Sequence, residues 1–226
     1  MYKKKLQNEL KTLKKKPVDG FHVSVDEKNI LNWEILIFGP IDTHYEGGIF
    51  KAKLIFSTEY PFQPPELIFK SEFWHPNVYK NGKVCISILH TPSKLNPEEA
   101  GHCWSPVQRV ETVLLSVISM LSDPNLSSPA NVDASVEMRQ NPEAFEMKVL
   151  SCVETSKLLA SKEQLELSEK YRKKMRKLAG LDVDEDDNDK DNDDNNNKSS
   201  SASSSSVDKK TETSGGQSKS RRKKTK

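Results

Sequence analysis

Hydrophobic and polar positions alternate along the first seventy residues with two different periods. In residues 2–16, leucines recur at positions 6, 10 and 13 among lysines, a spacing typical of an amphipathic helix that Pro17 would end. Further on, apolar residues recur at every second position, the period of a half-buried strand. Short connections between these runs favour an antiparallel meander, because parallel strands need long crossovers. The predicted strands are Phe21–Val25, Trp33–Phe38, Ile49–Phe56 and Glu66–Lys70.

The second half of the chain returns to helical spacing after residues 71–104, which have no clean period and are predicted to be loop-rich. Ser105 to Gln108 has the pattern of a capping box with proline at the first helical position, and an apolar stripe follows as far as Leu121. Two more helices are predicted at Val132–Arg139 and Glu143–Ala160, with charged residues 161–179 extending the last one. The pattern therefore predicts an α+β fold with one N-terminal helix, a four-stranded antiparallel meander, a loop-rich segment and three C-terminal helices.

Charge divides the chain into a domain and a tail. The formal net charge is only +2, but residues 182–197 hold nine acidic residues and one lysine, and residues 198–226 hold nine basic and two acidic residues. This tail lacks the apolar content that would offset the entropy of ordering, so it is predicted to be disordered. The terminal basic cluster fits a nuclear import signal, a nucleic-acid contact or a self-masking partner of the acidic block. Of these three, the nucleic-acid contact is the one that we do not expect. The predicted parts are a domain at 1–160, a charged helical extension at 161–180, and a tail at 181–226 with acidic (182–197), serine-rich (199–206) and basic (219–226) segments.

Cysteine content and hydropathy indicate a reducing compartment. Cys85, Cys103 and Cys152 lie far apart and cannot all pair, which argues against a secreted disulfide scaffold. Cys152 shares a helical stripe with Phe145 and Val149, so it is predicted to be core. No run approaches the roughly 20 apolar residues of a membrane span, and lysines follow the first two residues. We therefore expect a soluble protein of the cytoplasm, the nucleus or both, without membrane contact.

The most informative motif is a His75-Pro76-Asn77 turn placed eight residues before Cys85, counted from the asparagine. Upstream stands the segment Tyr60 to Pro65, and downstream Trp104-Ser105-Pro106. In this order and over about 160 residues, the chain resembles the catalytic domain of ubiquitin-conjugating enzymes. The segment Cys85 to His90, an inserted loop and the segment Ser128 to Asp133 are similar to the subgroup with an acidic C-terminal tail that works with cullin-RING ligases. The resemblance implies ubiquitin, an activating enzyme and a RING-type ligase as partners, with no cofactor and no metal.

Cys85 is the predicted nucleophile. A thiol both accepts and releases an acyl group, because a thioester stays reactive toward amines. No Cys–His pair is obvious, but thioester exchange does not need a strongly activated thiolate. Taken alone, a cysteine among Val84, Ile86 and Ile88 is more often a buried small hydrophobe. The surrounding motifs favour transthiolation followed by aminolysis. Transfer of a ubiquitin-like protein is the nearest alternative, and a non-catalytic module of the same fold, which typically lacks the cysteine, is the other.

Four further residues complete the catalytic site that the resemblance implies. Asn77 is expected to donate a hydrogen bond to the oxyanion of the tetrahedral intermediate, although it also fits a residue that merely closes a turn. Tyr79, Ser128 and Asp133 match positions along the approach of the acceptor lysine. Asp133 is expected to orient the ammonium and help it lose a proton, or alternatively to cap the helix near Val132. Ser128 occupies a gate position, or is a plain turn serine. His75 is expected to shape the loop rather than to move protons.

The resemblance also places a ligase-binding surface on the first helix and on Pro61, Phe62, Ser105 and Pro106. An exposed aromatic residue among prolines suits an interface anchor, whereas the competing interpretation puts Phe62 in the core. The inserted loop departs from its relatives, because its only acids are Glu98 and Glu99 and it contains Lys94. Zinc is not expected, because one group of possible ligands lacks any usual ligand spacing. These residues are Cys85, His90, His102 and Cys103.

Overall fold

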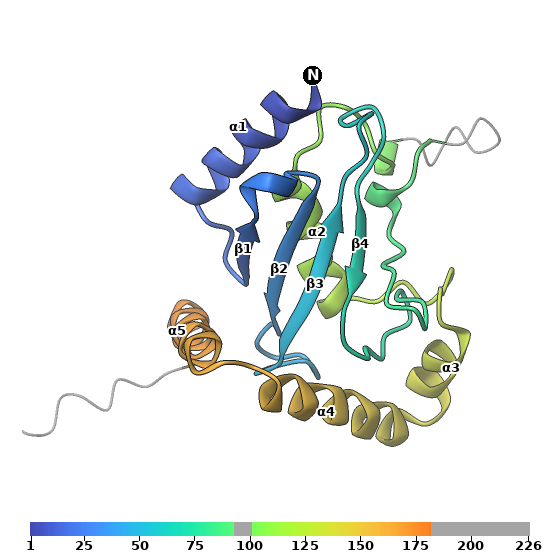
Figure 1. Cartoon of the computed structure of the whole chain (residues 1–226). Helices are drawn as coiled ribbons and strands as arrows, with labels where there is room; N and C mark the ends of the chain where they lie inside the picture. Colours follow the sequence, from blue (N-terminus) through green and yellow to red (C-terminus); the bar gives the residue numbers. More distant parts are fainter. Residues whose placement is uncertain (93–100, 182–226) are drawn as a thin grey trace, which may run out of the picture. The chain divides into compact units, whose positions relative to one another are not determined.

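The computed structural model describes residues 1–92 and 101–181. Its centre is a four-stranded antiparallel sheet in which each strand pairs with the next along the chain (Figure 1). The predicted α+β fold with its antiparallel meander is confirmed, and each strand lies within one residue of its expected bounds. The strands are β1 (Phe21–Val25), β2 (Asn32–Phe38), β3 (Ile49–Ile55) and β4 (Glu66–Phe69).

One face of the sheet forms the core, as the period-two pattern predicts. Phe50, Ala52 and Leu54 on β3 are buried, while Lys51 and Lys53 between them are half-buried. The register sets these three residues opposite apolar residues of β2, so that both strands present the same kind of face. Helix α2 (Val110–Ser122) lies behind the sheet in Figure 1, and its apolar stripe belongs to the same core cluster. The β2 partners are Ile37, Ile35 and Trp33.

Helix α1 (Tyr2–Lys15) contacts this core through Leu6 and Leu13, as expected from its stripe of leucines. It also buries Glu9, which the sequence pattern did not single out; only 7% of this residue is exposed. A carboxylate in such a position needs hydrogen-bond donors around it. Tyr60 and the backbone of Val110 supply them, so α1 is joined to two distant segments.

The predicted start of α2 is wrong by four residues, because the helix begins at Val110 and not at Pro106. Ser105 does not cap a helix; it closes a short turn in which the Gln108 N–H donates to the Ser105 carbonyl at 2.9 Å. The helix begins at Val110, whose N–H donates to the Glu9 carboxylate at 2.8 Å. A carboxylate at a helix N-terminus satisfies a donor without an intrahelical partner and complements the helix dipole.

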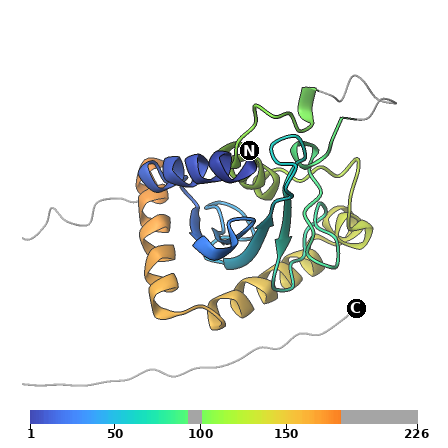
Figure 2. The same cartoon turned by 45° about the horizontal axis from the view of Figure 1, so that its top comes forward.

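The remaining helices are α3 (Val132–Gln140), α4 (Pro142–Leu158) and α5 (Lys162–Leu178), with short 3-10 turns η1 (Glu27–Asn29) and η2 (Ser87–Leu89). Cys152 is buried on α4, as predicted. The expected extension of α4 is instead a separate helix, because Ser161 caps α5 in a capping box with Gln164. Figure 2 shows α4 and α5 along two adjacent sides of the sheet.

Helix α5 has specific contacts despite its charged sequence. The Tyr171 ring lies 5.7 Å from the Phe38 ring, centroid to centroid, and Lys174 pairs with Asp19 at 2.6 Å. Within residues 1–92 and 101–181, no helix is long and apolar enough to cross a membrane. The predictions for the acidic residues and Lys94 of the inserted loop, and for the tail from residue 182, concern residues outside the described ranges.

Candidate active site

Cys85 follows a tight turn that ends the sheet region. The turn is closed by Gly82, whose N–H donates to the Tyr79 carbonyl at 2.8 Å. Gly82 has a φ of 84°, and a Cβ there would meet the Phe69 carbonyl oxygen at 2.3 Å, so only glycine fits. An isolated antiparallel bridge between Val78 and Val84 then leads to Cys85, whose N–H donates to the Asn77 carbonyl at 2.9 Å. The backbone thereby places the cysteine next to the asparagine.

The Cys85 side chain is half-buried and lines an open cleft of about 590 Å³. Asn77, Asn125 and Ser128 line the same cleft, so the structure brings together residues that are up to 51 positions apart in the chain. Asp123 and part of α2 form another wall. A thiol in this setting is neither sealed in the core nor fully exposed on the surface, which is the accessibility that attack on a large thioester requires.

Two hydrogen bonds fix the Asn77 side chain, which is only 2% exposed. Its amide Nδ2 donates to the Asn125 carbonyl at 2.8 Å, and its Oδ1 accepts from the Asn125 N–H at 2.8 Å. These bonds connect the loop before Cys85 to the segment after α2, so Asn77 closes the local structure. One Nδ2–H is used in this way, which leaves the second for another acceptor.

His75 supports the same loop from inside. Its Nδ1 accepts from the Asn77 N–H at 2.8 Å, and the proton on Nε2 is therefore donated to the Met120 carbonyl at 3.0 Å. Burial lowers the pKa of His75 to about 4, so the ring is neutral at physiological pH. Both ring nitrogens are occupied, and His75 has a structural part in the loop.

Tyr79 and Ser128 stand on the rim of the site. Tyr79 is 43% exposed, and the neighbouring Cys85 thiol raises the pKa of its phenol. Ser128 is exposed, and its N–H lies 3.4 Å from Asn125 Oδ1. The turn that contains Ser128 is therefore held by Asn125, and Ser128 lines the same cleft as Cys85.

Asp133 lies in the first turn of α3, but it does not cap this helix. The cap is Asn131, whose Oδ1 accepts from the Ala134 N–H at 3.2 Å, so the capping interpretation of Asp133 is wrong. Asp133 instead pairs with Lys80 at 2.7 Å, and the ammonium lowers the pKa of the carboxyl. Both side chains are well exposed, at 60% and 74%. An exposed pair of this kind is weak and is easily exchanged for another.

A histidine that the sequence interpretation left aside lies beside the thiol. His90 Nε2 is 3.5 Å from Cys85 Sγ. Cys85 and His90 lie on either side of η2, and this short 3-10 turn brings the two residues, five positions apart, next to each other. Neither strand nor helix periodicity predicts this contact, which explains why no Cys–His pair was found in the sequence.

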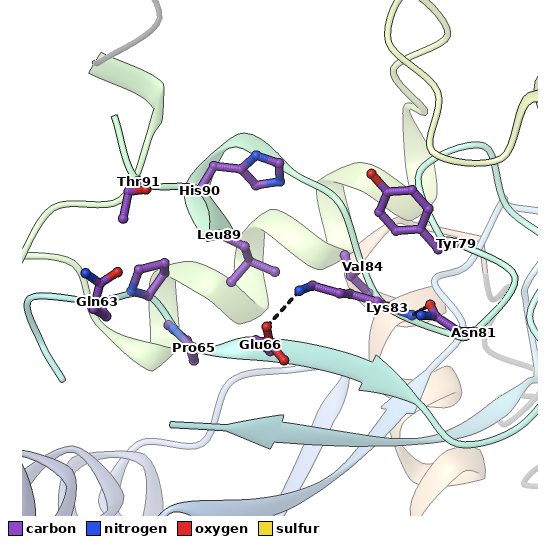
Figure 3. Close-up of a pocket in the computed structure, with 11 residues that line it drawn as sticks. Gln63, Pro65, Glu66, Tyr79, Asn81, Lys83, Val84, Leu89, His90 and Thr91 are labelled. Carbon is purple, nitrogen blue, oxygen red and sulfur yellow. Dashed lines mark hydrogen bonds and ion pairs between the residues drawn. The ribbon is translucent and has the colours of Figure 1, made fainter. Parts of the chain in front are cut away.

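A second groove, of about 620 Å³, adjoins the site on the side of β4. Figure 3 shows the rings of His90 and Tyr79 on the same side of this groove, above the ion pair between Lys83 and Glu66. That pair measures 2.7 Å. His90 lines both hollows, so it stands between the cleft of Cys85 and this groove.

The four predicted ligase-binding residues come together through Trp104. The indole Nε1 of this buried residue donates to the Pro61 carbonyl at 2.8 Å, which joins the Tyr60–Pro65 segment to Ser105 and Pro106. Pro61 is buried, Ser105 half-buried and Pro106 exposed. Phe62 is 61% exposed, so the interpretation that placed it in the core is wrong.

The cleft also contains side chains of the kinds that bind metal ions. Cys85, His90, His102 and Cys103 line the same cleft. Nevertheless, among the residues that the structure describes, no three or more histidine, cysteine or acidic side chains are grouped so that they could hold a metal ion.

Comparison with known proteins agrees with the fold. Residues 5–153 match the family model of the ubiquitin-conjugating enzyme. Ubiquitin-conjugating enzyme E2 15 of Schizosaccharomyces pombe is 53% identical over 154 residues, which are 67% of this chain and 92% of that protein. Ubiquitin-conjugating enzyme E2 14 of Arabidopsis thaliana is 55% identical over 155 residues, with the same coverage of 67% and 92%. A ubiquitin-conjugating enzyme E2 of African swine fever virus is 48% identical over 166 residues, 71% of this chain and 75% of the viral protein.

The chain therefore belongs to the ubiquitin-conjugating enzyme family. Its activity is the transfer of ubiquitin, and the expectation of an enzyme rather than a non-catalytic module is confirmed.

Proposed function

We propose that Cys85 accepts ubiquitin from an activating enzyme as a thioester and passes it to a lysine amine of a substrate or of ubiquitin. The observation that carries this proposal is the half-buried thiol in an open cleft, next to a buried asparagine amide. The thiol attacks the incoming thioester, and an amine later attacks the thioester on Cys85.

The proposal is tested by thioester formation with activating enzyme, ATP and ubiquitin. We expect a reductant-sensitive adduct that is absent in Cys85→Ala. Cys103→Ala is the matched control, because Cys103 is also half-buried and lines the same cleft, and this variant should form the adduct normally. An adduct that survives in Cys85→Ala and disappears in Cys103→Ala would assign the chemistry to the wrong cysteine and overturn the proposal.

Asn77 is proposed to stabilise the oxyanion that forms during aminolysis. Its second Nδ2–H is the donor for this purpose, and the bond to Asn125 holds the amide rigid. One oxyanion donor is typically worth about 3 to 4 kcal/mol of barrier. Asn77→Ala should therefore form the thioester but discharge it to lysine roughly 200- to 800-fold more slowly. Because the same substitution removes two buried hydrogen bonds, its thermal stability is measured in parallel. A discharge rate equal to that of the wild type would rule out the oxyanion role.

On the acceptor side, we propose that Asp133 orients the incoming ammonium while Tyr79 and Ser128 border its path. In the free enzyme, the Lys80 ammonium lies 2.7 Å from the Asp133 carboxylate, so this carboxylate already holds a lysine. Since exposed ion pairs contribute little, an acceptor lysine can displace Lys80 at small cost.

Phe62 and its neighbours Pro61, Ser105 and Pro106 are proposed to meet a RING-type ligase. Phe62 is 61% exposed and follows the buried Pro61, and an exposed aromatic side chain on a fixed backbone is well suited to anchor a partner. Phe62→Ala should lower ligase-stimulated discharge while leaving thioester formation unchanged. Equal stimulation of the variant and the wild type would refute this role.

We infer the subgroup, the domain limits and the location of the protein from its sequence. We infer that residues 1–160 form the catalytic domain, 161–180 its helical extension and 181–226 a tail. The acidic segment of the tail would attract a basic groove on a cullin-RING ligase, because long-range attraction speeds encounter and is screened by salt. Cytoplasm and nucleus are the proposed compartments.

A further inference from the structure

We propose that His90 is a further catalytic residue, which takes the proton of the Cys85 thiol when this thiol attacks an incoming thioester. The inference rests on the Cys85 thioester proposed above and deepens it. Its first support is geometric: His90 Nε2 lies 3.5 Å from Cys85 Sγ. A thiol donates a weak hydrogen bond, and the unprotonated nitrogen of an imidazole accepts it.

The second support is the way in which the fold holds His90. Within η2, the His90 N–H donates to the Ser87 carbonyl at 3.0 Å, and the His90 carbonyl accepts from the Trp104 N–H at 2.8 Å. Trp104 is almost completely buried and is itself bonded to Pro61. The backbone of His90 is therefore fixed on both sides, while its side chain is exposed to solvent and can exchange protons with water.

The proton taken from the thiol is returned to the leaving group, so the reaction needs no additional acid or base. As Sγ bonds to the carbonyl carbon of the incoming thioester, the thiol proton moves to His90 Nε2. The tetrahedral intermediate then breaks its bond to the sulfur of the donor enzyme, which leaves as a thiolate. The imidazolium returns the proton to this leaving sulfur, so that His90 is neutral again and no other reactant is consumed.

Other titratable groups surround the pair and define the controls. His75 cannot play this part, because both of its ring nitrogens are bonded within the core. His102 lines the same cleft and is exposed, so it is the matched comparison for His90. The remaining titratable groups around the two hollows are Tyr79, Cys103, Asp123 and the paired Lys83 and Glu66.

The test is single-turnover transfer of ubiquitin from loaded activating enzyme to the full chain, measured for wild type, His90→Ala and His102→Ala from pH 6 to pH 9. Each variant rate is divided by the wild-type rate at the same pH, so titration of the activating enzyme cancels. General bases contribute roughly 100-fold or more, but water can take the proton in their place, so we expect at least about a tenfold loss in His90→Ala at pH 7. The loss should shrink near pH 9, because hydroxide can then take the thiol proton in place of His90.

Added imidazole distinguishes proton transfer by His90 from a purely structural role of this residue. Because the site is open to solvent, free imidazole should restore part of the rate to His90→Ala and none to the wild type. A loss that is constant with pH and unaffected by imidazole would overturn the inference, as would an equal loss in His102→Ala. Failure of the wild type to form a reductant-sensitive Cys85 adduct would instead reject the proposed function, so the two failures are distinguishable.

Discussion

Glu9 joins three segments that are far apart in the chain, and its removal should destabilise the whole domain. From α1, its Oε1 accepts from the Tyr60 hydroxyl at 2.7 Å, and its Oε2 accepts from the Val110 N–H at 2.8 Å. The side chain is nearly buried, and Lys5 lies near it as a counter-charge, at 3.5 Å. The perturbation is Glu9→Ala, compared with Glu9→Gln and Tyr60→Phe.

The magnitude follows from these bonds. A hydrogen bond to a charged group contributes about 1.5 to 3 kcal/mol, so losing both should cost Glu9→Ala about 3 to 6 kcal/mol. Glu9→Gln can keep both contacts, since its oxygen accepts from Val110 and its amide donates to the Tyr60 oxygen. It loses only the charge, at about 1 to 2 kcal/mol. Tyr60→Phe removes one bond and should cost about the same.

Urea and thermal unfolding of the purified chain measure this order. In a protein of this size, 1 kcal/mol shifts Tm by about 2 to 4 °C, so Glu9→Ala should unfold roughly 10 °C below the wild type. Glu59→Ala is the control, an exposed acidic residue in the same loop as Tyr60, and should stay within about 0.5 kcal/mol of the wild type. If Glu9→Ala were no less stable than Glu59→Ala, the carboxylate would not hold these segments together.

Three further predictions concern other parts of the molecule. Because burial lowers the pKa of His75 to about 4, below the ordinary value near 6.5, the unfolded chain binds more protons between these values. The free energy of unfolding should therefore fall by up to about 3 kcal/mol as pH decreases from 6.5 to 4. Urea unfolding at several pH values should show a flatter dependence on pH in His75→Asn, and an unchanged dependence in the control His22→Gln, whose histidine is exposed. Lys80→Ala should raise the pKa of Asp133 toward its ordinary value, which carboxyl NMR titration measures. It should also lower KM for an acceptor lysine in discharge kinetics, and an unchanged KM would show that Lys80 does not compete with the acceptor. Deleting residues 182–226 should slow ligase-dependent turnover mostly at low salt, and identical salt profiles with and without the tail would contradict electrostatic steering.

Local patterns predicted the sheet well, because alternation along a strand reports directly which face is buried. The start of α2 could not be found in this way. Ser105 and Pro106 have the local features of a helix start, but the carboxylate that completes the true start belongs to Glu9, 101 residues before Val110. The break between α4 and α5 was readable in principle, because Ser161 and Gln164 form a capping box that the sequence contains.

The site shows the same division between local and tertiary information. Cys85 and Asn77 were identified by resemblance, and the structure brings them together in one cleft. The partners of Asn77 are backbone atoms of Asn125, and backbone atoms have no sequence signature. The contact of His90 with Cys85 depends on a 3-10 turn, and hydrophobic periodicity does not predict this turn.

Helix α2 is anchored at both ends by side chains from other segments. Its first residue, Val110, is held by Glu9, and near its last turn Met120 accepts the hydrogen bond of His75. The first end of α2 thus follows the segment of Trp104, and its last turn supports the loop that carries Asn77. This one helix therefore connects the proposed ligase-binding segment to the loop beside Cys85. Loosening either anchor should shift both ends together, and a substitution far from Cys85 can in this way alter the reaction without touching any group in the cleft.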